Sequence, residues 1–134
     1  MRTGINRLQR ATDDEGLTGI VQGKDASDLE ERVARSLYKR KLEFQFQYLV
    51  QTAVSLPQED RNVDFIIDNY GTYQALEVDG EIGHKSQSAQ EKDAMRDIFV
   101  NEALEWLNIK PIVRIAWDKL ETQELTDRTI MELI

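Results

Sequence analysis

The sequence contains no cysteine and a single histidine, His84, among its 134 residues. The absence of cysteine excludes disulfides, thiolate nucleophiles, iron–sulfur clusters and cysteine zinc sites within the chain. One histidine cannot build a two-histidine metal site. Any metal ion bound here must therefore be held by carboxylates, whose oxygen atoms favour Mg²⁺, Mn²⁺ or Ca²⁺.

Long apolar runs are also missing. No stretch approaches the ~18–20 apolar residues that a membrane-spanning helix requires, and residues 1–6 lack the apolar core of a signal peptide. We therefore expect an intracellular, cytoplasmic protein with no membrane partner, encoded by a cell or by a virus acting in the host cytoplasm.

Basic residues are in the minority, since 17 Lys and Arg stand against 25 Asp and Glu, a net charge of −8. This balance argues against nucleic-acid binding through bulk positive charge, although a local basic groove or a metal-bridged phosphate contact stays open. The charge is uneven: residues 1–41 hold nine basic and seven acidic residues, a balance of +2. The basic cluster within residues 32–41 is either a solvated helix face or a patch that faces phosphate.

The length and a 40% apolar content indicate one globular domain. Residues 1–24 show no sustained apolar period, so we expect a flexible N-terminal arm there and a single domain over 25–134. The order of apolar periods predicts an α/β fold, with a mixed four-stranded sheet flanked by helices and an extra C-terminal helix. The expected elements are a helix at 25–41, strands at 44–50, 63–67 and 73–78, a helix at 88–108, a strand at 110–115 and a helix from 118 onward.

Apolar residues at helical spacing predict which face of each helix is buried. In the first helix they are Ala26, Leu29, Val33 and Leu37. We expect Trp106 and Trp117 in the core rather than as platforms on which nucleic-acid bases stack. The predicted buried stripe of the 88–108 helix is Met95, Ile98, Phe99, Ala103, Trp106 and Leu107.

Three acidic residues lie in or at the end of predicted strands. Asp64 interrupts a strand that is apolar on both faces, and Glu77 and Asp79, two residues apart, share one face of the next strand. A hairpin turning at 68–73 brings Asp64 roughly opposite Glu77, and adjacent buried carboxylates raise each other's pKa unless a cation lies between them. The pattern thus indicates a divalent-metal site. Alternatively, these acids end strands in solvent or pair with a base such as Arg114.

These residues also carry a resemblance to a known family. Val63-Asp64-Phe65, then about a dozen residues, then Leu76-Glu77-Val78-Asp79-Gly80 and His84 resemble the PD-(D/E)xK nuclease superfamily. The chain is most similar to the branch of very-short-patch-repair-like endonucleases, with its vDF…EvDG…H signature. The similarity covers residues ~27–117 and includes Glu30 in the first helix, Gln45 or Gln47 on the first strand, Asp93-x-x-Arg96 in the second helix and Arg114 on the last strand.

The resemblance implies a restriction-endonuclease-like αβββαβ core and an endonuclease that hydrolyses DNA phosphodiester bonds with Mg²⁺ or Mn²⁺. It implies that Asp64, Glu77 and the backbone carbonyl of Val78 hold the metal, and that Glu30 reaches it directly or through water. Such a metal polarises the scissile phosphate and lowers the pKa of water. The residues implied in contacts with the DNA backbone are Gln47, Lys85, Arg96 and Arg114.

One position departs from the wider superfamily, because Asp79 stands where a lysine is expected two residues after the glutamate. An aspartate there is usual in the nearer branch. His84 or Lys85 can take over part of the lysine's role, and a histidine has a pKa suited to acid–base work. Alternatively, both are surface residues, and Arg96 and Arg114 pair with nearby carboxylates. The implied catalytic set is Glu30, Asp64, Glu77, Asp79 and His84.

The expected function is a metal-dependent DNA endonuclease of the repair, recombination or phage junction-resolving type. Such junction-resolving enzymes are commonly homodimers, because two symmetric cuts need two active sites. The main alternative is a catalytically inactive relative that binds nucleic acid or serves as a structural subunit. A plain acidic interaction domain without a site is the third interpretation.

Overall fold

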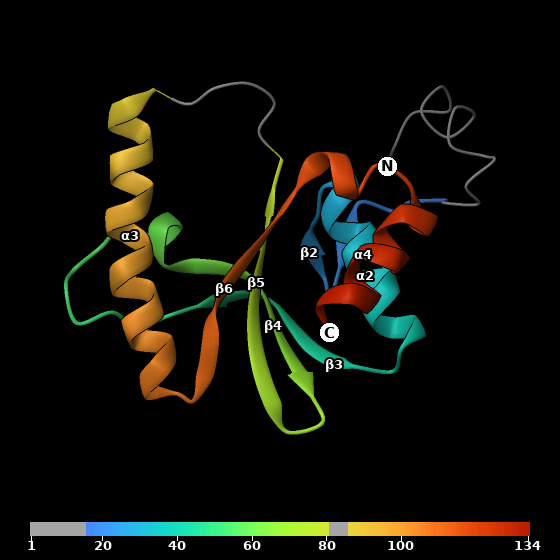
Figure 1. Ribbon diagram of the computed structural model, residues 1–134, viewed down its shortest axis with the longest axis horizontal. Helices are drawn as coiled ribbons and strands as arrows, with labels where there is room; N and C mark the ends of the chain where they lie inside the picture. The colour runs from blue at the N-terminus through green and yellow to red at the C-terminus, as the bar shows by residue number, and fades with distance from the viewer. Residues whose placement is uncertain (1–15, 81–85) are drawn as a thin grey trace.

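The computed structural model describes residues 16–80 and 86–134 (Figure 1). A short hairpin precedes a helix, three strands, a second long helix, a fourth strand and a C-terminal helix. The elements are β1 (Ile20–Val21), β2 (Lys24–Asp25), α2 (Asp28–Lys39), β3 (Glu43–Leu49), η2 (Gln58–Arg61), β4 (Asn62–Asn69), β5 (Thr72–Asp79), α3 (Gln87–Trp106), β6 (Ile109–Ala116), η3 (Trp117–Lys119) and α4 (Gln123–Leu133).

The main sheet has four strands in the order β3-β4-β5-β6. The first three pair antiparallel, and β5 pairs with β6 in parallel. A parallel pair needs a long crossover, which α3 supplies here. The α/β class and the mixed four-stranded sheet are therefore confirmed.

Helices cover both faces of this sheet, α3 on one side and α2 with α4 on the other (Figure 1). Two apolar clusters result. The α2–α4 side contains Val33, Leu37, Phe46, Phe65 and Ile130, and the α3 side contains Val63, Ile66, Ala75, Val100 and Leu104. Strand β4 contributes to both clusters, so Asp64 lies in a strand that is covered on both sides.

Helix α2 has a defined start and a defined end. Ser27 caps its first turn and forms a capping box with Glu30. At the other end, the backbone N–H of Lys41 donates to the Tyr38 carbonyl, and the backbone N–H of Leu42 donates to the Leu37 carbonyl. Lys41 has a φ of +58°. This pair of bonds is a Schellman motif, which turns the chain out of the helix and into β3.

The basic cluster within residues 32–41 contacts α4 and the turn before it. Arg32 is buried and donates to the Leu120 carbonyl, and Arg40 donates to the carbonyl of Ile130. Lys39 forms an ion pair of 2.7 Å with Asp127. These three basic residues therefore stabilise the packing of the first and last helices.

The buried face of α3 differs from the predicted stripe. Its buried residues are Val100, Ala103 and Leu104, whereas Met95 is 59% exposed, Ile98 61% and Trp106 84%. Leu107, just after the helix, is also exposed. Of the expected stripe, only Ala103 is buried and Phe99 half-buried, and the assignment of Trp106 to the core was wrong.

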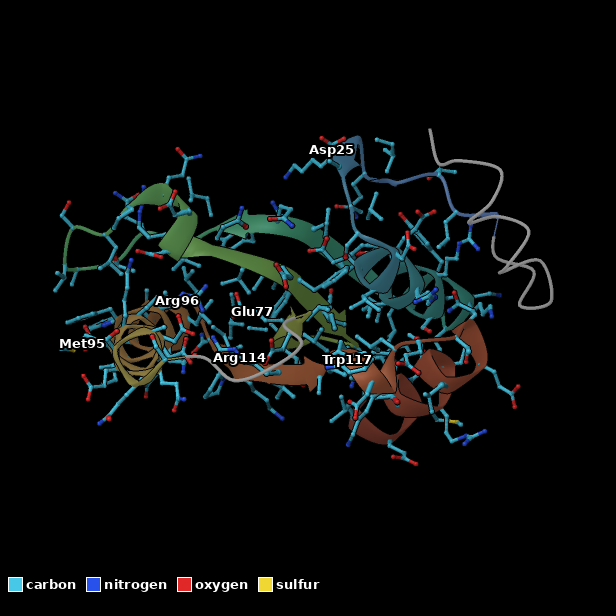
Figure 2. The ribbon with its side chains drawn as sticks, turned by 90° about the horizontal axis from the view of Figure 1, so that it is seen from above. Asp25, Glu77, Met95, Arg96, Arg114 and Trp117 are labelled. Atoms are coloured by element: carbon cyan, nitrogen blue, oxygen red, sulfur yellow. The ribbon has the colours of Figure 1, made fainter. Side chains whose placement is uncertain are left out.

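The reason is that α3 is apolar on two faces, and a polar contact decides which one meets the sheet. Arg96 lies one turn before Val100 on the covered face, and it pairs with Glu77 on β5. Met95 lies on the side of α3 that points away from Glu77 (Figure 2).

The hairpin β1–β2 occupies part of the segment expected to be a flexible arm. Leu17 and Val21 are buried, and the Glu31 carboxylate accepts the backbone N–H groups of Thr18 and Gly19. The side chain of Gln22 bonds to the outer backbone edge of β3. Residues 1–15 of the expected arm lie outside the described part of the chain.

Across the described ranges, no helix is both long enough and apolar enough to cross a bilayer.

Candidate active site

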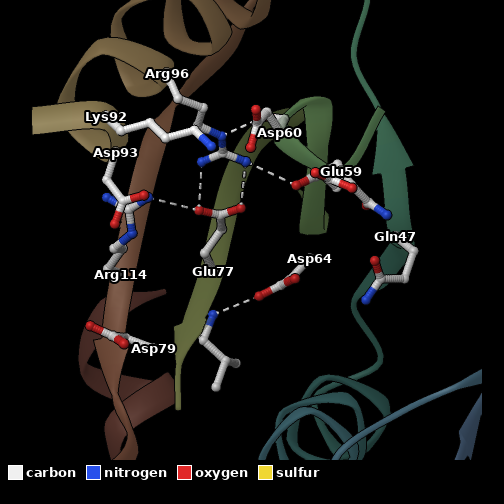
Figure 3. Close-up of a pocket in the computed structure, with 12 residues that line it drawn as sticks. Gln47, Glu59, Asp60, Asp64, Glu77, Asp79, Lys92, Asp93, Arg96 and Arg114 are labelled. Carbon is white, nitrogen blue, oxygen red and sulfur yellow. Dashed lines mark hydrogen bonds and ion pairs between the residues drawn. The ribbon is translucent and has the colours of Figure 1, made fainter. Parts of the chain in front are cut away.

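An open cleft of about 410 Å³ lies between α3, η2 and the ends of β4 and β5 (Figure 3). It contains seven of the ten predicted site residues: Gln47, Asp64, Glu77, Val78, Asp79, Arg96 and Arg114. It also contains Glu59, Asp60, Asn62, Lys92 and Asp93. The three remaining predicted site residues are Glu30, His84 and Lys85. Of these, His84 and Lys85 lie outside the described residues.

The β4–β5 hairpin aligns the two central acids. The ladder pairs Phe65 with Leu76, and the same register carried one residue further sets Asp64 opposite Glu77. One oxygen of Asp64, Oδ2, accepts the backbone N–H of Val78 at 2.8 Å. This bond fixes the carboxyl group at the floor of the cleft.

Among the described residues, Asp64 has no cationic side chain as a hydrogen-bond or ion-pair partner. Burial raises its pKa to about 7, and the nearby charges of Glu30 and Glu77 act in the same direction. The Val78 N–H and the more distant Arg96 only partly oppose this shift. No described residue donates a hydrogen bond to the second oxygen, Oδ1. A cation placed here would lower the pKa and stabilise the charged form.

Glu77 is in the opposite situation, because two guanidinium groups hold it. Arg96 binds both of its oxygens at 2.9 Å, and Arg114 binds Oε1 at 3.1 Å. In this structure the two arginines thus form the carboxylate pairs that the sequence left open as an alternative to phosphate contacts.

Asp97 on α3 completes the ion-pair network and was missed by the sequence analysis. Arg96 and Arg114 both donate to its carboxylate. Burial alone pushes the pKa of Asp97 upward, but the hydrogen bonds from the two arginines outweigh it and the pKa is lowered. The available signal was its spacing, since Asp93 and Asp97 are four residues apart on α3 and flank Arg96.

Gln47 and Glu30 approach the site from the side of β3 and α2. Gln47 is left-handed within a strand, at φ +59°, a conformation that costs about 1–2 kcal/mol for a side chain of this kind. Its neighbours Phe46 and Tyr48 pair with the residues on either side of Asp64, and its amide donates to Glu30 Oε2 at 3.3 Å. Glu30 is therefore linked to the cleft through Gln47 and also caps α2.

The charged residues that line the cleft are six acids and three bases. Two of the bases, Arg96 and Arg114, are already paired with carboxylates. Lys92 forms no hydrogen bond or ion pair within the described residues. A phosphate group therefore meets an excess of negative charge in this cleft unless a further cation accompanies it.

The carboxylates and backbone carbonyls of the cleft offer oxygen ligands, which hard divalent ions prefer. The half-buried carboxyl of Asp64, whose Oδ1 accepts no hydrogen bond from a described residue, fits such an ion. Within residues 16–80 and 86–134, no three acidic or histidine side chains are already gathered as a metal cluster. Glu77 does not contribute to such a cluster because its carboxylate is engaged in ion pairs with Arg96 and Arg114.

The chain was also compared with known proteins, by family, by curated sequence and by solved structure. No protein-family model, no curated protein and no solved structure matches it. A function for this chain must therefore be inferred from the cleft and its residues.

Proposed function

We propose that this protein is a divalent-metal-dependent endonuclease that hydrolyses DNA phosphodiester bonds, and that its helices and strands form a restriction-endonuclease-like αβββαβ core. The observation that carries the proposal is the pair Asp64 and Glu77. These acids face one cleft from adjacent strands, and Asp64 is half-buried there with no cationic partner among the described residues. The order α2, β3, β4, β5, α3, β6 agrees with the expected core.

In this proposal Asp64, Glu77 and the carbonyl of Val78 would hold Mg²⁺ or Mn²⁺, and Glu30 would reach the ion directly or through a water molecule. When bound, the ion polarises the phosphate and lowers the pKa of a water molecule. The chain's own contribution is orientation. The Val78 N–H fixes one oxygen of Asp64 and leaves the other free, and the strained Gln47 holds Glu30 toward the same cleft.

The proposal extends to the wider role suggested by the resemblance: a homodimer that acts in DNA repair, in recombination or on phage DNA junctions. His84 and Lys85 keep their proposed parts in acid–base chemistry and in contacts to phosphate. Both follow the Glu77–Gly80 string in the sequence.

A second candidate function is a catalytically inactive relative that binds nucleic acid or serves as a structural subunit. It is favoured by the ion pairs of Glu77, which satisfy this carboxylate without a metal. It is also favoured by Asp79 in place of the superfamily lysine and by the net charge of −8.

A cleavage assay separates the two. The protein is incubated with supercoiled, linear and four-way-junction DNA, and with RNA, in Mg²⁺ or Mn²⁺. We expect DNA cutting that falls by roughly 100-fold or more in Asp64→Asn and Glu77→Gln. Glu121→Gln, an exposed acid outside the cleft, is the matched control and should cut normally.

If no substrate is cut while the variants keep the wild-type circular dichroism spectrum, the endonuclease proposal is rejected and the inactive relative replaces it. Cutting that persists in Asp64→Asn would place the chemistry elsewhere in the molecule.

A further inference from the structure

The two arginines that bind Glu77 are anchored very differently. The Arg96 side chain is only 11% exposed, and its five N–H groups are all used. They reach the carbonyls of Asp60 at 2.6 Å and Asn62 at 2.9 Å, both oxygens of Glu77, and Asp97. Removing Arg96 from this position would take a donor away from two partly buried backbone carbonyls, which is costly.

Arg114 has a much looser attachment. It projects from β6, an edge strand, and its side chain is 40% exposed. Within the described part of the chain, its hydrogen bonds go only to carboxylates: one to Glu77 Oε1 at 3.1 Å and the others to Asp97. The guanidinium can therefore release Glu77 and remain paired with Asp97, with no backbone group losing a partner.

Both arginines meet at one atom, since Glu77 Oε1 accepts Arg96 Nη1 at 2.9 Å and Arg114 Nη2 at 3.1 Å. A divalent ion that uses this oxygen must approach two guanidinium charges. Like charges at such a distance repel, and one of the two contacts must yield. The contact made by the exposed Arg114 is the cheaper one to break.

We propose that Arg114 is a displaceable internal cation at Glu77: it competes with a divalent metal ion for this carboxylate and so sets the affinity of the cleft for the metal, while Arg96 stays in place as the anchor. This inference rests on the proposed function, because it takes Glu77 as a metal ligand. Arg114, whose contact with Glu77 is drawn in Figure 3, is a positioning residue in this scheme, and Asp97 is the group that retains it after displacement.

The test is Ca²⁺ binding by isothermal titration calorimetry at fixed ionic strength, on the full chain. We expect Arg114→Gln to bind Ca²⁺ about fivefold more tightly than the wild type, the scale of one partly exposed ion pair. Arg128→Gln is the matched control, because it also removes one positive charge but from an exposed pair with Glu124 on α4. It should leave the affinity unchanged.

Arg96→Gln is a second comparison, and it should bind Ca²⁺ no more tightly than the wild type because Glu77 loses its anchor. Wild-type affinity in Arg114→Gln, or an equal gain in Arg128→Gln, would overturn the displacement proposal.

The controls separate this failure from failure of the proposed function. If the wild type binds Ca²⁺, Asp64→Asn abolishes binding and Arg114→Gln shows no gain, only the role of Arg114 is rejected. If neither the wild type nor Arg114→Gln binds Ca²⁺, the metal site and the role of Arg114 are rejected together.

Discussion

Burial of a single carboxyl group, that of Asp64, couples the stability of the fold to pH. Its pKa is raised from 3.8 to about 7, first by burial and then by Glu30 and Glu77, with Arg96 opposing. The folded state therefore binds more protons than the unfolded state between these two values. By linkage, the free energy of unfolding should fall as pH rises from about 4 to about 7 and then level off.

Asp64→Asn removes this pH dependence while keeping an oxygen for the Val78 N–H. We expect the variant to be more stable than the wild type by roughly 2 kcal/mol at pH 8, and the gap to close toward pH 4. Urea unfolding in EDTA at pH 5, 6.5 and 8 measures this. Parallel pH profiles for the two proteins would show that Asp64 is charged in the folded state near neutral pH.

The unequal anchoring of Arg96 and Arg114 predicts unequal costs of removing them. Arg96→Met should lower the free energy of unfolding by about 3 kcal/mol, because Glu77 loses its two-bond partner and two carbonyls lose their donors. Arg114→Met should cost no more than about 1 kcal/mol. Chemical denaturation of both variants at pH 7 measures these two changes. Equal losses in the free energy of unfolding would contradict the distinction between an anchor and a displaceable cation.

At the scale of elements, the end of α2 carries a strain that glycine would relieve. Lys41 is at φ +58° in the position of a Schellman motif where glycine is preferred. Lys41→Gly should raise the free energy of unfolding by about 0.5–1 kcal/mol. Arg40→Gly, one residue earlier at φ −86°, is the control and should be destabilising. Thermal unfolding of the two variants in parallel measures the difference, and a loss of stability in both would contradict the strain.

The two apolar faces of α3 should respond very differently to substitution. Leu104 is fully buried and Trp106 is 84% exposed. We expect Leu104→Ala to cost about 3 kcal/mol and Trp106→Gln less than about 0.5 kcal/mol, as measured by urea unfolding at low protein concentration. A large loss at Trp106 would show that the outer face of this helix is covered in solution.

Element order and the mixed sheet could be predicted from the sequence because apolar periods are local signals, and the facing of Asp64 and Glu77 followed from the length of the hairpin turn. The rotation of α3 about its axis could not be predicted, because the helix has two apolar faces and the ion pair between Arg96 and Glu77 selects the one that packs on the sheet. The hairpin β1–β2 escaped prediction for a similar reason. Its strands have two residues each, and distant groups such as Glu31 and Gln22 hold it in place.

At the scale of the whole molecule, the proposed function requires a protein of net charge −8 to approach a polyanion. The bases that the sequence offers for DNA contacts are mostly committed: Arg32, Lys39 and Arg40 bind α4 and the turn before it, and Arg96 and Arg114 bind Glu77 and Asp97. A divalent ion in the cleft supplies positive charge where these residues do not. Under the proposed function, we therefore expect the metal ion to take part in binding the substrate as well as in the chemistry.

The most direct test of the proposed metal site is an anomalous difference map at the manganese absorption edge, from crystals grown with Mn²⁺. We expect a single strong peak in the cleft, about 2.2 Å from carboxylate oxygens of Asp64 and Glu77, with the Arg114 guanidinium turned away from Glu77. An empty cleft at saturating Mn²⁺, with Glu77 still paired to both arginines, would contradict it.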